Sequence, residues 1–282
     1  MNFVSYLTNC LKNDKLIRWP DRFMPLKVYV APFRWYKEKG QEYFYYAMIK
    51  DAFDIWKNAS GGKLSFEFVD NLYNSQINIE WKRVDRKSLG HCLYNFDQEG
   101  RLFSAEIQIG LSDGLLHRQY EDKNEVKHTI IHEIGHALGV NHSPYLEDIM
   151  YVPHQYGATS VSNRDKTTLK WLYNFPAGVT KNDILLQYNF SSDYTLDHLV
   201  YFLENPEQSS DEKLEIIPEQ LQDKTILREK MPESRQEKDL HYEQDTLAEL
   251  NKYNLSLQNI NVSSNMQEYF KKMRMKKDLN KE

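Results

Sequence analysis

The stretch His132–His142 constrains this chain more than any other feature, and it reads His-Glu-Ile-Gly-His-Ala-Leu-Gly-Val-Asn-His. His132 and His136 are four residues apart, so on an α-helix their imidazoles point the same way and can bind one metal ion. Gly139 can take the positive φ that stops the helix and lets the chain double back. His142 can then supply a third nitrogen. The spacing therefore predicts a helix that ends at a three-histidine metal site.

Glu133 is the candidate base of this site. It follows the first histidine, which turns its side chain by about a third of a helical turn away from the metal and toward a water held by the metal. Three neutral imidazoles leave one coordination position of zinc open, and zinc lowers the pKa of a water there to about 7. An open position is typical of a catalytic site. We therefore expect one catalytic Zn²⁺, held by His132, His136 and His142, with Glu133 as general base and acid.

The motif HExxHxxGxxH resembles the signature of the metzincin clan of zinc endopeptidases, with every specified residue present. That clan carries a methionine turn beneath the zinc, and Met150 stands where it can form a floor without being a ligand. Ser143 directly after the third histidine, and Tyr151 directly after the methionine, are similar to the matrixins, the matrix metalloproteinase type. In astacins and serralysins the zinc-reaching tyrosine stands two residues after the methionine, where this chain has Val152. The resemblance implies a zinc-dependent endopeptidase that hydrolyses peptide bonds in proteins.

The hydrophobic pattern before the motif predicts one long helix and several strands. Apolar residues recur every three or four positions over residues 41–60, and Gly61 and Gly62 end that helix. Apolar residues alternate with polar ones in the candidate strands. These strands cover residues 26–31, 64–69, 76–81, 89–95 and 102–109. A strand, a helix and then strands suggest a crossover onto a mixed sheet, and matrixins have the same order.

Two further helices complete the expected fold. In the helix of the motif, Asn124 is the expected N-cap, and His128 is expected to be solvated. A later helix begins after Ser162, with Asp165 three residues on, and stops before Pro176. The stripe of the motif helix that should face the sheet consists of Val126, Ile130, Ile134 and Leu138. We therefore predict an α+β fold of the α/β metzincin type, with a twisted mixed five-stranded sheet and three helices.

The chain divides into three parts by composition and by the extent of the resemblance. Residues 1–18 form an N-terminal segment to which we assign no fold, and residues 19–176 match the matrixin catalytic unit. Residues 177–282 form a charged region, mostly helical or disordered, with a short helix expected over 195–203. The role of this last region is open, and it is a candidate for docking an unknown partner.

The strand expected over residues 89–95 is the candidate substrate edge, at Gly90, His91 and Cys92. An edge strand offers unpaired backbone groups to which an extended peptide can add as another strand. In many matrixins a histidine on this strand helps bind a structural zinc, and His91 matches it, but the other ligands of that site do not appear. The glycine- and aspartate-rich calcium loops are also missing over 97–101. We therefore expect no structural zinc or calcium.

Charge and cysteine content limit the partners and the compartment. Of 41 acidic and 36 basic residues, 20 acidic and 14 basic ones lie from Ala177 onward, so the preceding part is nearly neutral. This distribution argues against nucleic-acid binding by the catalytic part. Cys10 and Cys92 make no disulfide framework. No export signal and no run of about 20 apolar residues is visible, so we expect no transmembrane segment and a cytoplasmic or non-classically exported protein.

Two alternatives to a protease remain open at this stage. The first is a zinc-binding protein-interaction module without turnover, against which the intact Glu133 speaks. The second makes the charged region 177–282 the functional part, with the metal domain only accompanying it. Within the stretch 152–161 after Met150, His154 either lines the pocket beside the metal or is exposed.

Overall fold

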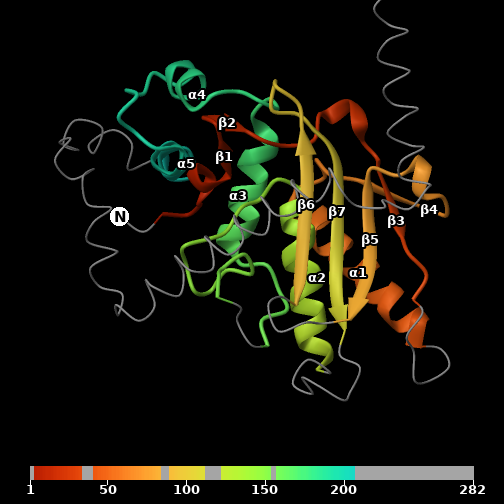
Figure 1. Cartoon of the computed structure of the whole chain (residues 1–282). Coiled ribbons are helices and arrows are strands. Elements are labelled where there is room, and N and C mark those ends of the chain that lie inside the picture. Colours follow the sequence, from red (N-terminus) through yellow and green to blue (C-terminus); the bar gives the residue numbers. More distant parts are fainter. Residues whose placement is uncertain (1–2, 34–40, 84–88, 112–121, 154–156, 207–282) are drawn as a thin grey trace, which may run out of the picture. The chain divides into compact units, whose positions relative to one another are not determined.

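The computed structural model of the 282-residue chain describes residues 3–33, 41–83, 89–111, 122–153 and 157–206. Figure 1 shows a mixed sheet with helices on one side of it and further helices beyond its edge. The strands are β1 (Leu11–Lys12), β2 (Lys15–Leu16), β3 (Leu26–Val30), β4 (Phe66–Val69), β5 (Ile77–Arg83), β6 (Gly90–Phe96) and β7 (Leu102–Leu111). The α-helices are α1 (Gln41–Ala59), α2 (Lys123–Ala137), α3 (Asn163–Asn174), α4 (Lys181–Gln187) and α5 (Leu196–Glu204).

The main sheet has five strands in the order β4-β3-β5-β7-β6. Strands β4, β3, β5 and β7 are parallel, and β6 runs antiparallel to β7. The mixed five-stranded sheet confirms the predicted α+β fold, and β6 lies at an edge of the sheet as expected. Helices α1, α2 and α3 correspond to the three predicted helices, while α4 was not predicted.

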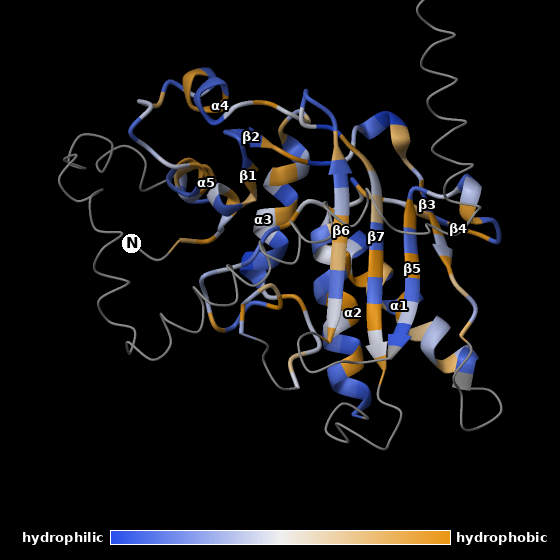
Figure 2. Cartoon of the chain, in the orientation of Figure 1, coloured by the Kyte–Doolittle hydropathy of each residue, from blue (hydrophilic) through white to orange (hydrophobic). Residues whose placement is uncertain are grey.

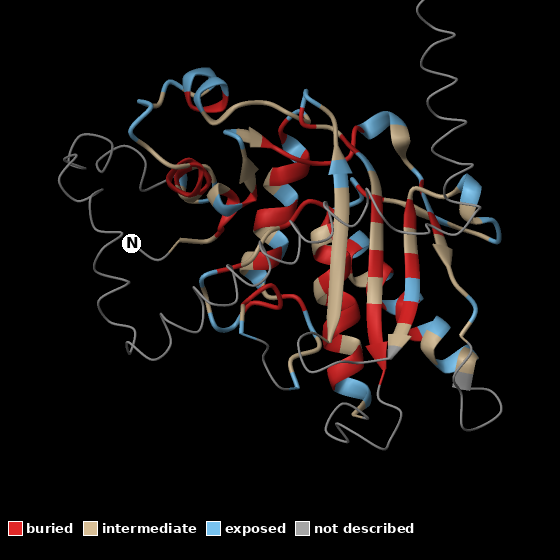
Figure 3. Ribbon diagram, in the orientation of Figure 1, coloured by how far each residue is buried: buried red, intermediate tan, exposed pale blue. Residues whose placement is uncertain are grey.

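The core lies between the sheet and the helices α1 and α2. Buried and less buried residues alternate in the middle of β7, from Ser104 to Ile109, as the apolar and polar residues do there; Figures 2 and 3 show the strand by hydropathy and by burial. Phe53 of α1 packs its ring against Phe66 and Phe68 of β4, with ring centroids 4.7 and 5.6 Å apart. The indole of Trp56 donates to the carbonyl of Ile131, which joins α1 to α2. The sheet and α1 therefore fix the position of α2.

Helix α2 buries the stripe that its periodicity predicted, but two expectations about it were wrong. Its N-cap is Asp122, whose carboxylate accepts from the amide of Asn124 at 2.8 Å; an acidic cap at a helix N-terminus gains from the helix dipole. His128 is buried and its Nδ1 lies 2.7 Å from the carbonyl of Ala158. The loop after Met150 folds over α2, a contact that local periodicity does not encode. His154 lies outside the described residues.

Residues on both sides of the expected 19–176 unit pack into the same core. A short helix was expected over residues 195–203, and α5 is observed over Leu196–Glu204, with Thr195 as its N-cap. Leu16 pairs with the backbone of Val179 and Gly178. The buried apolar residues of the two flanking parts include Tyr6, Leu7, Cys10, Leu16, Ile17, Ile184, Leu185, Leu196, Leu199 and Val200. We therefore propose that the folded unit extends to at least Pro206.

A chain ended after Pro176 is expected to lose most of its stability, and a chain ended after Pro206 to keep it. The shorter chain lacks α4 and α5, whose Ile184, Leu185 and Leu199 are fully buried. Each such side chain contributes about 1.5 to 3 kcal/mol, against a total of about 5 to 15 kcal/mol for a typical domain. Thermal unfolding followed by circular dichroism should place the shorter chain at least about 10 °C below the full chain. Equal midpoints would contradict the proposed boundary.

Candidate metal centre

Three histidines converge where α2 ends. His132 and His136 stand on the last turns of α2, and His142 lies in the loop that follows. The Nε2 atom of His136 is 3.2 Å from Nε2 of His132 and 3.0 Å from Nε2 of His142. Among the described residues, these three form the one group whose ligand atoms all lie within 4.8 Å of one another. The structure thus brings the three predicted ligand residues together.

The hydrogen bonds of the imidazoles show that this cluster fits a metal ion. Nδ1 of His132 lies 2.8 Å from the carbonyl of Ile149, and Nδ1 of His136 lies 2.9 Å from the carbonyl of Val140. A carbonyl only accepts, so each Nδ1 carries the proton and each Nε2 of a neutral ring carries a lone pair. Two lone pairs 3.2 Å apart repel each other unless a cation lies between them. Two zinc–nitrogen bonds of about 2.1 Å in tetrahedral geometry separate their nitrogens by about 3.4 Å.

Burial keeps the rings of His136 and His142 neutral. Burial lowers the pKa of His136 well below its usual 6.5, and His142 and His132 lower it further. Burial, with a smaller effect of Lys12, lowers the pKa of His142 to about 4. A metal binds the neutral imidazole, so at neutral pH no proton has to be displaced from either ring.

The turn after α2 delivers His142 and orients His136. The amide of Gly139 donates to the carbonyl of His136 and the amide of Val140 to the carbonyl of Gly135, which together form a Schellman motif. Gly139 has a φ of +91°, and a Cβ on it would lie 2.2 Å from the carbonyl oxygen of Ile17. The positive φ expected from the sequence is confirmed. Glycine is also needed here for space, because the backbone of Ile17, in the N-terminal part of the chain, lies against this position.

Met150 packs beneath α2 at Gly135. Met150 is fully buried, and a Cβ on Gly135 would lie 2.4 Å from its sulfur and 2.9 Å from the ring of Trp56. The methionine therefore lies under the helical turn that carries His132 and His136, which is where the resemblance to the metzincins led us to expect it. The packing role of Gly135 was missed, although a glycine inside a helix, which costs about 1 kcal/mol relative to alanine, signals such close contact.

Glu133 faces the edge strand β6. A Cβ on Gly90 would lie 2.8 Å from Oε1 of Glu133, so the glycine leaves room for this carboxylate. Cys92 lies on the same face of β6, and burial together with the charges of Glu133 and Glu106 raises the pKa of its thiol well above the usual value. His91 alternates with these two and projects from the other face of the sheet. Of the three candidate edge residues, two therefore lie beside Glu133.

Burial raises the pKa of Glu133 from 4.5 to about 8, and Lys82 opposes this shift. In zinc-free protein, the unfolded chain releases this proton above pH 4.5 while the folded chain keeps it up to about pH 8. The contribution of Glu133 to stability therefore falls as pH rises through this window, whereas His136 and His142, whose pKa values are lowered in the fold, contribute in the opposite sense up to about pH 6.5. Glu133→Gln lacks the titrating group. As pH rises through the window, its unfolding free energy should therefore increase relative to that of wild type, by at most about 1.4 kcal/mol per pH unit.

Urea unfolding in the presence of a chelator, at the two ends of this window, measures the difference. Glu67→Gln, at an exposed glutamate of β4, is the matched control and should follow wild type. Parallel curves for wild type and Glu133→Gln would show that the Glu133 carboxyl is not held protonated in the zinc-free fold.

The structure is an α+β domain in which three histidines that could hold a metal ion meet at the end of a helix. The family profile described as Matrixin matches residues 33–174, just over half of the chain. The chain belongs to the matrixin family. Membership implies zinc dependence, which agrees with the three-histidine group. Of the helices in the described ranges, none combines the length and the apolar character that crossing a membrane requires.

Several viral proteins are similar to this chain. The protein named "Putative matrix metalloproteinase" in Heliothis virescens ascovirus 3e is 34% identical over 118 residues, 36% of this chain and 24% of the relative. A protein of the same name in Trichoplusia ni ascovirus 2c is 26% identical over 155 residues, 49% of this chain and 30% of the relative. "Probable matrix metalloproteinase 095L" of Invertebrate iridescent virus 3 is 25% identical over 127 residues, 42% of this chain and 35% of the relative. The chain thus spans about a quarter to a third of the length of these curated relatives.

Proposed function

We propose that this chain is a zinc-dependent metalloendopeptidase that hydrolyses peptide bonds in proteins. The observation that carries the proposal is the convergence of three imidazoles on one point, with the Nε2 atoms of His132 and His136 facing each other. Membership in the matrixin family supports it. In this proposal His132, His136 and His142 hold one catalytic zinc, and Glu133 is the catalytic residue that handles protons.

Zinc, when bound here, supplies a Lewis acid that polarises a carbonyl and lowers the pKa of a water to about 7. The three imidazoles hold it without adding charge, so its positive charge favours the ionised form of Glu133 against the effect of burial. The carboxylate of Glu133 accepts a proton from the water that attacks the peptide carbonyl. It then passes this proton to the nitrogen of the leaving amine. Gly90 keeps space for the carboxylate, since any side chain there would contact Oε1.

Strand β6 is the proposed substrate edge. It pairs with β7 on one side, and no strand in the described ranges pairs with its other side. The backbone amides and carbonyls along that outer edge can pair with an extended peptide, as in β-strand addition. The inner face of β6 carries Gly90 and Cys92 beside Glu133. A peptide bound along β6 would therefore lie close to the proposed base.

The test uses the purified full chain, elemental analysis and a broad peptide library read by mass spectrometry. We expect about one zinc per chain, cleavage of peptides, loss of cleavage with a chelator and recovery with added zinc. His142→Ala should lose both zinc and cleavage. Zinc without cleavage would support the interaction module without turnover, and absence of zinc would refute the metal site. Partner docking by the region 177–282 stays a prediction from the sequence, and residues 207–282 of that region lie outside the described residues.

A further inference from the structure

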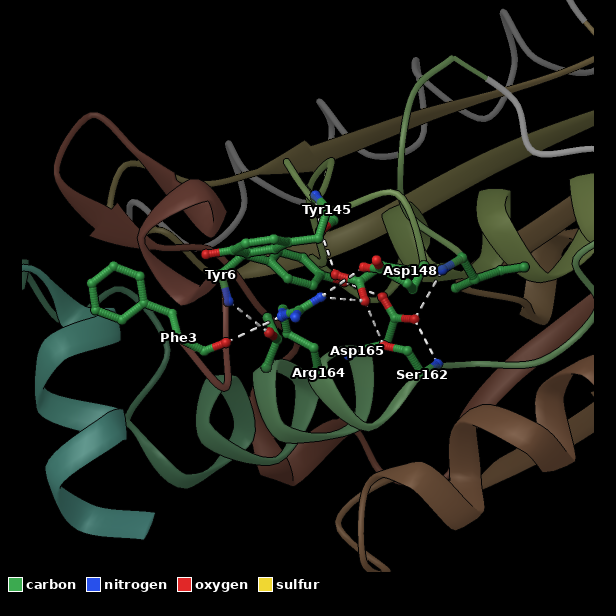
Figure 4. Close-up of polar contacts among 11 residues, drawn as sticks. Phe3, Tyr6, Tyr145, Asp148, Ser162, Arg164 and Asp165 are labelled. Atoms are coloured by element: carbon green, nitrogen blue, oxygen red, sulfur yellow. Dashed lines mark hydrogen bonds and ion pairs between the residues drawn. The ribbon is translucent and has the colours of Figure 1, made fainter. Parts of the chain in front are cut away.

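Residues 3–10 belong to the N-terminal segment 1–18 and lie outside the region that the family profile matches, residues 33–174. Its Tyr6 is buried and its phenol donates to Oδ1 of Asp165 on α3 at 2.6 Å (Figure 4). The other oxygen of Asp165 accepts from the amide of Ile149 at 2.9 Å. The carbonyl of Ile149 lies 2.8 Å from Nδ1 of His132. Three hydrogen bonds thus connect Tyr6 to the first metal ligand.

Asn9 connects the same segment to the third ligand. Its side-chain amide donates to the carbonyl of His142 at 3.0 Å, and the side-chain amide of Asn141 donates back to the carbonyl of Asn9 at 2.8 Å. This reciprocal pair fixes the backbone on which the imidazole of His142 stands. The N-terminal segment therefore reaches two of the three histidines by separate routes.

The segment is itself held by α3 and α5. The buried Asp197 of α5 accepts from the hydroxyl of Ser5 at 2.7 Å and from the amide of Leu7 at 2.5 Å. The amide of Tyr6 donates to the hydroxyl of Thr168 on α3 at 3.0 Å. Arg164 of α3 donates to the carbonyl of Phe3 at 3.2 Å (Figure 4). These anchors give Tyr6 and Asn9 fixed positions from which they can orient the ligands.

We propose that Tyr6 and Asn9 are positioning residues for the metal ligands His132 and His142, and that docking of the N-terminal segment and metal binding strengthen each other. The inference rests on the proposed metal centre. Partners that orient metal ligands from behind typically contribute about 10-fold to 100-fold to metal affinity. The coupling is reciprocal, because a segment that holds the ligands is in turn held better once they are bound.

The measurement is the Zn²⁺ dissociation constant of the full chain, by competition with a chelating dye under conditions where circular dichroism shows the fold intact. We expect Tyr6→Phe to weaken zinc binding about tenfold, since only the phenolic oxygen is removed. Ser60→Ala is the matched control: it also removes a buried hydroxyl that holds the backbone, here just after α1, where that hydroxyl donates to the carbonyl of Lys57 and accepts from the amide of Leu64. Both variants should unfold at lower temperature, but only Tyr6→Phe should lose affinity.

Asn9→Ala is the second variant and addresses the case in which Tyr6→Phe does not fold. The side chain of Asn9 is exposed, so its removal costs the fold little, yet it should also weaken zinc about tenfold. Asn71→Ala is its control, an exposed asparagine that accepts one backbone hydrogen bond before β5. The visible spectrum of bound Co²⁺, which reports the geometry of the ligands, should change in Asn9→Ala and stay as in wild type in Asn71→Ala.

Each outcome decides one of the two claims. If wild type binds one zinc and both Tyr6→Phe and Asn9→Ala bind it equally tightly with an unchanged Co²⁺ spectrum, the two residues are merely structural and the inference is overturned. If wild type binds no zinc, the metal centre itself is refuted and the inference falls with it. Weaker zinc binding in these variants and not in their controls supports the positioning role.

Discussion

Glu133→Ala is expected to keep about one zinc per chain and to hydrolyse peptides about 100-fold to 10,000-fold more slowly than wild type. In the proposed mechanism Glu133 moves protons and makes no bond to the metal, whereas the three histidines supply all the bonds. Its carboxylate lies against β6 rather than among the facing Nε2 atoms. The variant should therefore separate catalysis from metal binding.

Elemental analysis and single-turnover peptide hydrolysis, measured on the same preparation, give the two readouts. His136→Ala is the matched variant one turn along α2, and it should lose zinc as well as hydrolysis. A Glu133→Ala variant that cleaves as fast as wild type would refute the proton-transfer role. Loss of zinc in Glu133→Ala would instead show that this carboxylate helps to hold the metal.

The three-histidine cluster could be predicted because its geometry is local. His132 and His136 share a helix face by their spacing, and Gly139 permits the turn that returns His142. The sheet and the helices α1, α2 and α3 were also predictable, since hydrophobic periodicity follows from one buried face per element. The observed bounds of some elements differ from the expected ones by a few residues. For example, β4 was expected to begin at residue 64 and begins at Phe66.

The parts that sequence reasoning missed depend on contacts between distant residues. Tyr6 and Asp165 are 159 residues apart, and Leu7 and Asp197 are 190 apart. Hydrophobic periodicity does not reveal contacts between residues so far apart in the sequence. No structure was therefore predicted for residues 3–18 or for α4. One signal was available: Asp197 stands in the first turn of the short, mostly apolar helix α5, and a carboxylate buried there needs donors from elsewhere. His128 was misassigned for the same reason, since its partner Ala158 comes from a loop.

Gly139→Ala is expected to reduce the unfolding free energy by about 4 kcal/mol or more and to release zinc, a loss in the range that marks a specific structural conflict. Two effects add at this position. A side chain at φ +91° is strained, and its Cβ would lie 2.2 Å from the backbone oxygen of Ile17, which cannot move aside as a flexible side chain could. Relief of the clash must shift the turn that delivers His142 and the carbonyl of Val140 that holds His136.

Gly61→Ala separates the two effects and is the matched control. Gly61 also has a positive φ, +61°, but a Cβ there would meet nothing within 4 Å. It should therefore cost only the backbone strain, about 1 to 3 kcal/mol, and leave zinc bound. Urea unfolding and elemental analysis of both variants make the comparison. If Gly139→Ala and Gly61→Ala lost the same amount of stability and Gly139→Ala kept its zinc, the backbone of Ile17 would have moved aside at little cost. The turn would then not need glycine at residue 139 for space.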